Sequence, residues 1–464
     1  MSKTGRGQAS AIIWFRQDLR LTDQAALAAA ARGGAVIPVY VLDDETPGDW
    51  RIGGAQRWWL HHSLAGLAAA LESKGSRLIL RKGKVHEVLA GLAQEAGTCR
   101  IHALRHYEPW WKKAEAAVAK DHELRLHDGN YLAPPAHVVS GSNARYRIFT
   151  PWWRALKAQM PPQKPVPAPA RISAPSTWPA SDRLSDWTLL PTCPNWANQF
   201  EQYWRPGEDG ARAALDCFLP ALEDYENARN LPSHDGSSRL SPHLHFGEIS
   251  PATVWYRCAA RAHARAEPYL REVGWRDFGA NVIDQFPDYA RHNGREGYAV
   301  RWRTGGSADA DYEAWTKGRT GYPIVDAGMR QLWAIGWMHN RVRMIAASFL
   351  IKHLLIDWRR GERWFWDTLV DADYGNNSQN WQWVAGSGVD SSPFGRIMAP
   401  LSQSAKFQAG DYIRRWVPEL AGLDDKLVHD PHAAGCTPSD YPEPLIGHGA
   451  ARERALVAQR GNWR

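Results

Sequence analysis

The densest group of chemically versatile side chains lies in residues 371–383, which read DADYGNNSQNWQW. The carboxylates of Asp371 and Asp373 and the amides of Asn376 and Asn377 fall in a predicted turn after a helix. Turns commonly contain Asp and Asn, but so many polar groups between apolar helical segments need another reason. Each buried polar group without a partner costs roughly 1–3 kcal/mol. The segment therefore predicts a pocket for a large ligand that is both aromatic and polar.

A second candidate lies in residues 270–279, LREVGWRDFG, which we expect to be helical. Glu272, Trp275, Arg276 and Gly279 follow helical spacing, so they share one face of that helix. A carboxyl, an indole and a guanidinium beside a small residue could line a cavity. The alternative is a surface Glu–Arg pair with the tryptophan anchored in the core, and these residues alone favour that alternative.

Residues 337–344 give a third candidate, because Trp337, Asn340 and Met344 lie on one stripe of a predicted helix. An Asn side chain offers donors and an acceptor to an amide or nucleobase edge, and Met is a soft, adaptable contact for aromatic ligands. In the alternative interpretation, Asn340 caps a neighbouring loop and Met344 packs in the core. The sequence leaves both interpretations open.

A phosphate site is indicated by residues 236–241, GSSRLS, which end at Ser241, the predicted N-cap of a helix. Hydroxyls and free backbone amides at a helix N-terminus can bind phosphate, although Ser-rich loops are common. Basic side chains beside the candidate pocket segments are expected to contact further phosphates: Arg229, Arg341, Arg396 and Lys406.

The elements that must position these side chains follow two patterns. In residues 1–135 strands and helices alternate, which is typical of βαβ units, so we expect an α/β domain with a Rossmann-like parallel sheet. The first strand is not followed by a GxGxxG motif, so the dinucleotide fingerprint is missing. Strands are expected at residues 11–15, 35–42, 77–81 and 100–104, and helices at residues 25–32, 56–74, 85–96 and from Pro109.

Residues 136–205 are interpreted as an interdomain linker, because Pro, Ser and Ala are frequent there and periodicity is weak. Strand signals vanish over residues 206–464, where we expect a larger all-α domain. Ser241 and Ser250 each precede a proline, a pattern typical of an N-cap followed by Pro at the first helical position.

The composition limits the classes of protein that fit. A length of 464 residues favours two domains, and a net charge of +7 favours polyanions, nucleic acid first. The five cysteines contain no CxxC pair, so neither a metal site nor a disulfide framework is expected. The sequence shows no apolar run of about 18 residues and no signal peptide at its polar start. We therefore expect a cytoplasmic protein with no membrane span.

Together these segments resemble the photolyase/cryptochrome family, and the nearest likeness is to microbial cyclobutane pyrimidine dimer (CPD) photolyases of class I or class III. The resemblance implies an α/β antenna domain followed by a helical domain that holds FAD, active as FADH−, in a folded shape. The matching runs span nearly the whole chain in the family's order: IIWFRQDLRLTDQAAL, DYENARN, GSSRLSPHLHFGEIS, EVGWRDF, GYPIVDAGMRQL, GWMHNRVRM, DADYGNNSQNWQW and PFGRIMAP.

The resemblance also assigns roles to individual residues. The implied catalytic residues are Glu272, Asn340 and Asn377, the last facing flavin N5, and the implied electron-transfer chain is Trp381, Trp358 and Trp302. The implied FAD-binding residues are Tyr225, Ser237, Ser238, Arg239, Leu240, Ser241, Arg276, Arg343, Asp371, Ala372, Asp373 and Asn377. The implied contacts to the lesion and the DNA are Arg229, Glu272, Trp275, Asn340, Arg341, Met344, Trp383, Arg396 and Lys406.

The activity that the resemblance implies is light-driven repair of UV-damaged DNA. Excited reduced FAD passes an electron to a flipped CPD, which splits into two pyrimidines. We hypothesise that Glu272 donates a hydrogen bond to a dimer carbonyl, which requires a protonated carboxyl. An antenna chromophore is also implied, with methenyltetrahydrofolate favoured over 8-hydroxy-deazaflavin and Glu108 as a candidate contact. We expect no obligate protein partner.

Two related activities remain as alternatives. A (6-4) photolyase usually shows paired His residues where this chain has Met338, His339 and Asn340. A cryptochrome-like photoreceptor without repair often carries a long C-terminal extension, whereas this chain stops soon after its last helical run. Plant cryptochromes also usually carry Asp at the position of Asn377. These features favour CPD repair.

Overall fold

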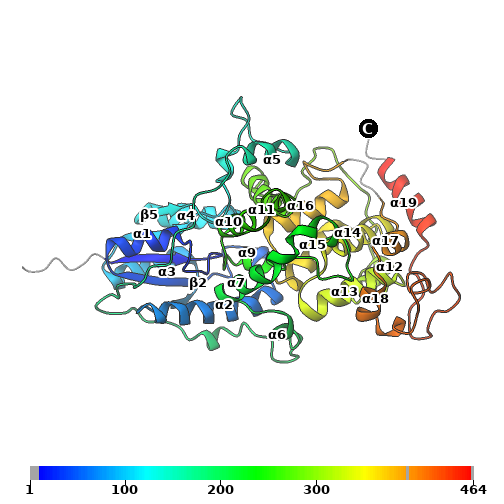
Figure 1. Ribbon diagram of the computed structural model, residues 1–464, viewed down its shortest axis with the longest axis horizontal. Coiled ribbons are helices and arrows are strands. Elements are labelled where there is room, and N and C mark those ends of the chain that lie inside the picture. The colour runs from blue at the N-terminus through cyan, green and yellow to red at the C-terminus, as the bar shows by residue number, and fades with distance from the viewer. Residues whose placement is uncertain (1–9, 393–396, 461–464) are drawn as a thin grey trace, which may run out of the picture.

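The computed structural model describes residues 10–392 and 397–460, in which two parts of different architecture follow each other along the chain (Figure 1). The N-terminal part contains a five-stranded parallel sheet in the order β3-β2-β1-β4-β5. The predicted α/β domain with a parallel sheet is therefore confirmed. Its strands are β1 (Ala11–Phe15), β2 (Val36–Leu42), β3 (Ile79–Lys82), β4 (Arg100–Leu104) and β5 (Glu123–His127).

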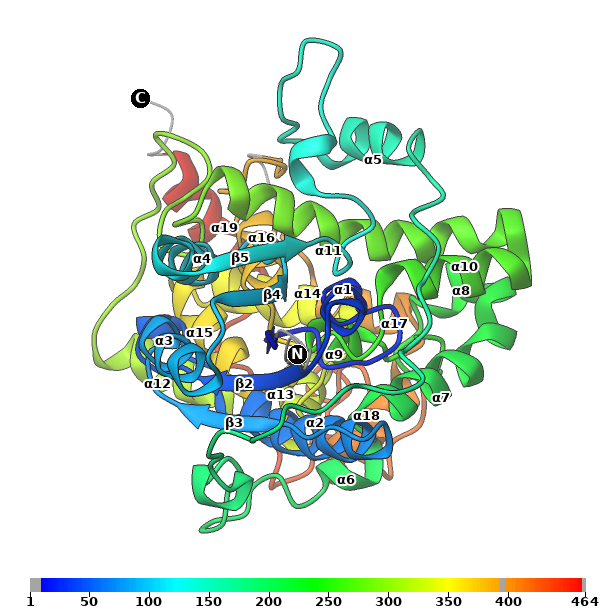
Figure 2. The same ribbon diagram turned by 90° about the vertical axis from the view of Figure 1, so that its left-hand side faces the viewer.

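Helices cover both faces of this sheet, and the part of the molecule that contains it faces the viewer in Figure 2. Because side chains alternate along a strand, Ile13 and Phe15 of β1 pack with α1 and α2, whereas Ile12 and Trp14 pack with α3 and α4. The result is a three-layer arrangement with β1 in its centre. The four helices are α1 (Ala25–Gly33), α2 (Gly54–Ser73), α3 (Val85–Ala96) and α4 (Pro109–Asp121).

The sequence did not predict the strand β5, and the composition of this strand explains why. It lies at the edge of the sheet, where Glu123 and Arg125 alternate with half-buried leucines. Charged residues are common on edge strands, and they interrupt the apolar run that marks a buried strand.

The larger C-terminal part is helical. From residue 206 on, the described residues form helices and no strand, as the sequence predicts. No described helix combines the length and the apolar character needed to cross a bilayer. The helices are α7 (Glu208–Phe218), α8 (Tyr225–Ala228), α9 (Ser241–His245), α10 (Pro251–Ala262), α11 (Glu267–Gln285), α12 (Gly306–Thr316), α13 (Pro323–Ile335), α14 (Asn340–Ser348), α15 (Trp358–Thr368), α16 (Tyr374–Ala385), α17 (Pro400–Lys406), α18 (Gly410–Trp416) and α19 (His448–Arg460).

The segment between the two parts contains α5 (Phe149–Lys157) and α6 (Phe200–Tyr203). Its backbone bonds to the α/β part: Val36 N donates to Ser173 O at 2.9 Å, and Ile172 N donates to Lys74 O at 3.0 Å. The connector therefore lies against the α/β part. The proposed boundaries at residues 135 and 205 stay an interpretation.

The two predicted serine caps have different outcomes. Ser250 Oγ accepts from Thr253 N at 3.0 Å at the start of α10, as an N-cap does. The prediction for Ser241 is wrong by one position, because Leu240 is the N-cap residue of α9 and makes no side-chain cap bond. Ser241 is instead the first residue of this short helix.

A buried carboxylate joins the helical part to the α/β part. Glu248 is completely buried and accepts from Trp59 Nε1 of α2 at 2.9 Å and from Gly207 N at 2.7 Å. It also contacts the ring of His243 in α9. A single side chain thereby satisfies donors from three separate segments, which holds the helical part against α2.

Candidate active site

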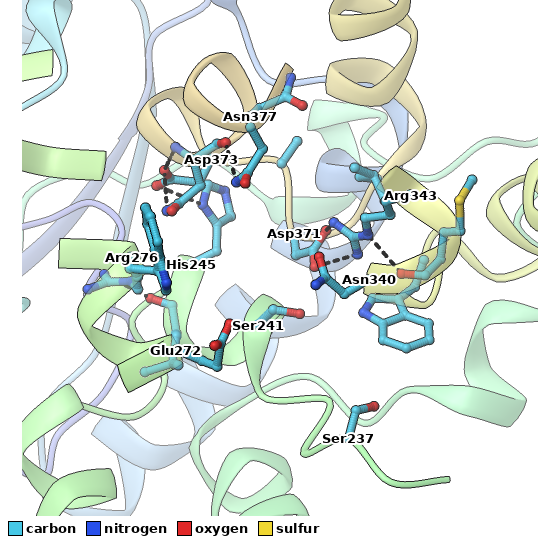
Figure 3. Close-up of a pocket in the computed structure, with 18 of the residues that line it drawn as sticks. Ser237, Ser241, His245, Glu272, Arg276, Asn340, Arg343, Asp371, Asp373 and Asn377 are labelled. Atoms are coloured by element: carbon cyan, nitrogen blue, oxygen red, sulfur yellow. Dashed lines mark hydrogen bonds and ion pairs between the residues drawn. The ribbon is translucent and has the colours of Figure 1, made fainter. Parts of the chain in front are cut away.

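A cavity of about 490 Å³ lies in the helical part, enclosed by residues of α8, α9, α11, α14, α15 and α16 (Figure 3). A volume of this size is typical of sites for small molecules and cofactors. The cavity collects most of the side chains that the sequence singled out, although their motifs are far apart in the chain. These are Tyr225, Arg229, Ser237, Ser238, Arg239, Leu240, Ser241, Glu272, Trp275, Arg276, Asn340, Arg343, Met344, Asp371, Ala372, Asp373, Asn377, Trp381 and Trp383.

An ion pair fixes one wall of the cavity. Arg343 of α14 donates to both oxygens of Asp371, with Nη1–Oδ1 at 3.1 Å and Nη2–Oδ2 at 2.9 Å (Figure 3). Its Nε donates to Met338 O at 2.7 Å, which locks the guanidinium plane. The Asp371 side chain is 3% exposed, so this charge needs its bidentate partner.

The second carboxylate of this segment caps α16. Asp373 Oδ1 accepts from the backbone and side-chain nitrogens of Asn376, both at 2.8 Å. The predicted turn at Asn376 and Asn377 is wrong, because both residues lie in the first turn of α16. Burial opposes ionisation of Asp373, but His245, whose Nδ1 is 3.9 Å from Oδ2, and the Asn376 amide hold its pKa below the ordinary value. An anionic cap thus faces the cavity.

The amide of Asn377 has a fixed orientation. Its Nδ2 donates to the backbone oxygen of Glu362 in α15 at 3.0 Å, and the residue is 8% exposed. Asn377 therefore lines the cavity with an amide group that α15 holds in place.

On the opposite wall, α11 presents the face that its spacing predicted. Arg276 does not form the expected pair with Glu272 and instead donates to Asn130 O at 2.6 Å and to Leu244 O at 3.2 Å. Trp275 stacks on Phe149 of α5 with ring centroids 3.5 Å apart and an interplanar angle of 8°. The cavity interpretation of this segment is therefore confirmed over the surface-pair alternative.

The partner of Glu272 is Arg229, whose Nη1 lies 2.5 Å from Glu272 Oε1. This ion pair was not indicated by the sequence. The hydrogen bond from Glu272 to a dimer carbonyl stays a hypothesis.

The loop before α9 closes a further side of the cavity. Ser238 Oγ accepts from Tyr269 Oη at 3.0 Å, and Arg239 has a left-handed backbone with φ of 52°. Gly236 lets the loop lie against α8, since a Cβ there would be 2.6 Å from Ala228 O. The loop thus brings two hydroxyls and a guanidinium to the cavity.

The chemistry of the lining fits a flavin nucleotide. Gln379 Oε1, a buried atom of the lining, has no hydrogen-bond partner among the residues that the structure describes. The same holds for His245 Nδ1, whose contact with Asp373 Oδ2 at 3.9 Å is too long for a hydrogen bond. Aromatic and sulfur-containing side chains supply flat apolar surface beside them, among them Trp337, Phe365 and Met344. A ligand with an apolar ring system and polar edges would satisfy both kinds of surface.

Three of the expected phosphate contacts lie off the cavity lining or cannot be placed. Arg341 and Lys406 both lie against the ring of Phe407, at 4.5 Å and 5.4 Å from its centroid. Arg341 also donates to Asn230 Oδ1. Arg396 lies outside the described residues.

The three predicted electron-transfer tryptophans differ in their surroundings. Trp381 lines the cavity, Trp358 is completely buried and donates from Nε1 to Asn293 Oδ1 at 3.2 Å, and Trp302 is half-buried. Gly361, one turn after Trp358, lies directly against Trp381. Their role stays a prediction.

The expected antenna contact is enclosed. Glu108 is 2% exposed, and burial, followed by the charge of Asp373, raises its pKa to about 7. Its Oε2 accepts from Tyr107 N at 3.2 Å. The antenna role of Glu108 stays a prediction, and a pigment would have to reach this carboxyl inside the molecule.

Sequence reasoning missed several lining residues: His245, Tyr269, Phe365 and Gln379. A signal existed for His245, which follows Ser241 by one helical turn in the SPHLH segment. Phe365 gave no signal, because an aromatic residue on an amphipathic helix is equally well explained by the core.

Comparisons with known proteins cover most of the chain. A model of the FAD binding domain of DNA photolyase matches residues 269–460, and a DNA photolyase model matches residues 11–170. The deoxyribodipyrimidine photo-lyase of Agrobacterium fabrum is 47% identical over 97% of both chains. Cryptochrome-1 of Arabidopsis thaliana is 33% identical over all of this chain and 72% of its own. The crystal structure of a bacterial class III photolyase from Agrobacterium tumefaciens superposes with a TM-score of 0.93, at 46% identity and 99% coverage of both chains.

Proposed function

The chain belongs to the photolyase/cryptochrome family, and from that membership we propose that it is a deoxyribodipyrimidine photo-lyase that repairs CPDs in UV-damaged DNA with light. One observation carries the proposal. The side chains suited to a flavin, such as Asp371 and Asn377, and those suited to a flipped pyrimidine dimer, such as Glu272 and Asn340, line one cavity. An electron donor and its acceptor would therefore be held side by side.

The flavin side of the cavity carries groups that would bind the cofactor and fix its orientation. When bound, reduced FAD excited by blue or near-UV light would lend the dimer one electron and regain it after the ring has split, so that no net redox change results. The Arg343–Asp371 pair presents a fixed polar edge, and the Asn377 amide is anchored by α15. The hydroxyls of the loop before α9, with Ser241 at the helix start, offer donors to the phosphates.

The lesion side is more open. Trp383 is 40% exposed and faces the cavity with Trp275, so the two indoles offer flat surfaces to a dimer. The Asn340 amide can bond a pyrimidine edge, and an ionised Glu272 can accept from a pyrimidine imide N–H. Extrusion of a dimer is helped because a damaged pair is already poorly stacked.

Three basic side chains are proposed to contact the flanking phosphates: Arg229, which lines the cavity, and Arg341 and Lys406, which lie against the ring of Phe407. Each lies on the surface or at its edge, as phosphate contacts require. Such contacts position the duplex without reading its sequence, and they make binding depend on salt.

Finer assignments are also proposed. The likeness to a class III photolyase favours class III over class I. A folate antenna is proposed ahead of a deazaflavin, on the likeness to photolyases, and the absorbance spectrum of the freshly purified protein tests it. A DNA substrate and five unpaired cysteines, all within the described ranges, favour a reducing compartment that contains DNA, for which we propose the cytoplasm.

The test of the proposal is repair itself. The purified protein, chemically reduced, should restore thymine-dimer-containing DNA under blue light and leave it unchanged in the dark. A parallel substrate with a (6-4) lesion should remain unrepaired. A flavin-loaded protein that left thymine dimers intact would sink the proposal and favour the photoreceptor alternative.

A further inference from the structure

The two residues expected to meet different parts of damaged DNA are bound to each other. Arg229 is expected to hold a phosphate and Glu272 to hold the lesion, yet their side chains form an ion pair at 2.5 Å. The pair bridges the end of α8 to α11 at the cavity lining, and the guanidinium lies 5.3 Å from the centre of the Tyr225 ring. While this pair holds, Arg229 Nη1 and Glu272 Oε1 are occupied by each other and are not offered to a phosphate or a lesion.

The surroundings make a lone charge unfavourable here. The two side chains are 23% and 31% exposed, so each is partly withdrawn from water. Burial lowers the pKa of Arg229, but the pairing with Glu272 outweighs it, and the net pKa is raised. Arg341 lies close enough to Arg229 for the two cations to repel each other. A partly buried charge that loses its partner without a replacement is destabilised.

Undamaged and damaged DNA differ in what they offer this pair. A normal duplex brings a phosphate to Arg229 but no group for Glu272, so the carboxylate would be left alone at the cavity. A duplex with a flipped dimer brings both a phosphate for Arg229 and an imide N–H for Glu272. Only the damaged duplex therefore gives both Arg229 and Glu272 a new partner when their ion pair opens.

We propose that the Arg229–Glu272 ion pair determines selectivity for damaged DNA, because it opens at low cost only when phosphate and lesion arrive together. The inference rests on the proposed function and adds to it a source of discrimination against undamaged DNA. The pair therefore weakens binding to normal duplex more than binding to a dimer-containing duplex.

The experiment measures dark binding of the flavin-loaded protein to a labelled duplex and to the same duplex with one thymine dimer, at fixed salt. Glu272→Gln should tighten binding to the undamaged duplex about 3- to 10-fold, which is the range for a partly exposed ion pair. Binding to the dimer duplex should change less, so the ratio of the two dissociation constants should fall.

Asp216→Asn is the matched control. Asp216 pairs with Arg257 at 2.5 Å on an exposed surface, and its loss changes the net charge by the same amount. It should leave the selectivity ratio unchanged. The double variant Arg229→Gln/Glu272→Gln supplies the second check, because the Glu272 substitution should no longer tighten undamaged binding once Arg229 is gone.

The inference is overturned if Glu272→Gln and Asp216→Asn change undamaged binding equally, or if the tightening persists without Arg229. A wild-type protein that bound both duplexes equally would instead count against the proposed function. The two failures are therefore distinguishable.

Discussion

At the scale of single residues, Glu362 is a buried acid whose surroundings disfavour a charge. It is 1% exposed, and neither carboxyl oxygen has a hydrogen-bond partner among the described residues. Burial raises its pKa well above the ordinary value. Its backbone oxygen holds the Asn377 amide, so this uncharged acid stands directly behind the cavity wall.

We predict that Glu362→Gln stabilises the protein increasingly as pH rises. The folded carboxyl keeps its proton where the unfolded one loses it, so the wild type is most stable below the unfolded pKa and loses stability as pH rises toward the folded pKa. The difference between variant and wild type should grow by up to about 1.4 kcal/mol per pH unit above pH ~4.3. Urea unfolding at pH 5, 6 and 7 measures it.

The control for this prediction is Glu72→Gln, which removes the same group from the exposed surface of α2. Its effect on the free energy of unfolding should be small and flat over the same pH range. A flat difference for Glu362→Gln as well would mean that its carboxyl ionises in the folded protein.

Asp371 supports a second residue-scale prediction. Asp371→Asn removes the charge that Arg343 holds bidentately, which leaves a cation without its partner in the cavity wall. Flavin affinity should fall about 10- to 100-fold. The ratio of flavin to protein absorbance after gel filtration reports it, and Asp357→Asn, beside the more exposed Arg359, should retain flavin.

Most lining residues could be named from the sequence, but their pairing could not. Glu272 and Arg276 are one turn apart, and helical spacing placed both on the cavity face. The true partner of Glu272 is 43 residues away and on another helix, where spacing carries no information. Long-range ion pairs of this kind follow from packing and become visible only in the folded structure.

At the scale of elements, α15 and α16 pack through a glycine. A Cβ on Gly361 would lie 2.2 Å from Trp381 Cη2 and 2.5 Å from Leu350 Cδ2. Gly361→Ala should therefore force the helices apart and lower the free energy of unfolding by about 1–3 kcal/mol, as overpacking does. It should also displace the indole that lines the cavity.

Gly91→Ala is the matched control, since Gly91 lies inside α3 with no atom within 4 Å of an added Cβ. Helix propensity alone predicts a gain of about 0.5–1 kcal/mol there. Thermal and urea unfolding of both variants separate the two effects. Equal gains for both variants would show that α15 has room beside Trp381.

Element types could be predicted better than element boundaries. Short apolar runs rich in β-forming residues gave four of the strands in the described fold, whereas β5 lacks such a run. The Asp373–Asn377 segment was predicted as a turn because Asp and Asn favour both turns and helix starts. The same side-chain-to-backbone bond serves either structure, so the residues alone do not distinguish them.

At the scale of the whole molecule, Glu248 ties the helical part to α2 of the α/β part. Glu248→Ala would leave the Trp59 indole N–H and the Gly207 amide without their acceptor. We predict a loss of about 2–4 kcal/mol in the free energy of unfolding. Urea unfolding followed by tryptophan fluorescence measures it.

The exposed Glu223→Ala serves as the control for this variant, because its pair with Arg265 lies on the surface. Surface ion pairs contribute little, so unfolding should change by a few tenths of a kcal/mol. If Glu248→Ala behaved like this control, the junction would be held by other contacts.

The stacked rings of Phe149 and Trp275 have a consequence for how quickly a lesion can be captured. Phe149 belongs to the connector and is 1% exposed, so the plane of the Trp275 indole is immobilised during folding. The Trp275 side chain already has a single orientation when the dimer binds. Binding therefore costs no further conformational entropy for ordering this side chain. A substitution in the connector at this position would therefore slow the docking of the lesion before it unfolded the protein.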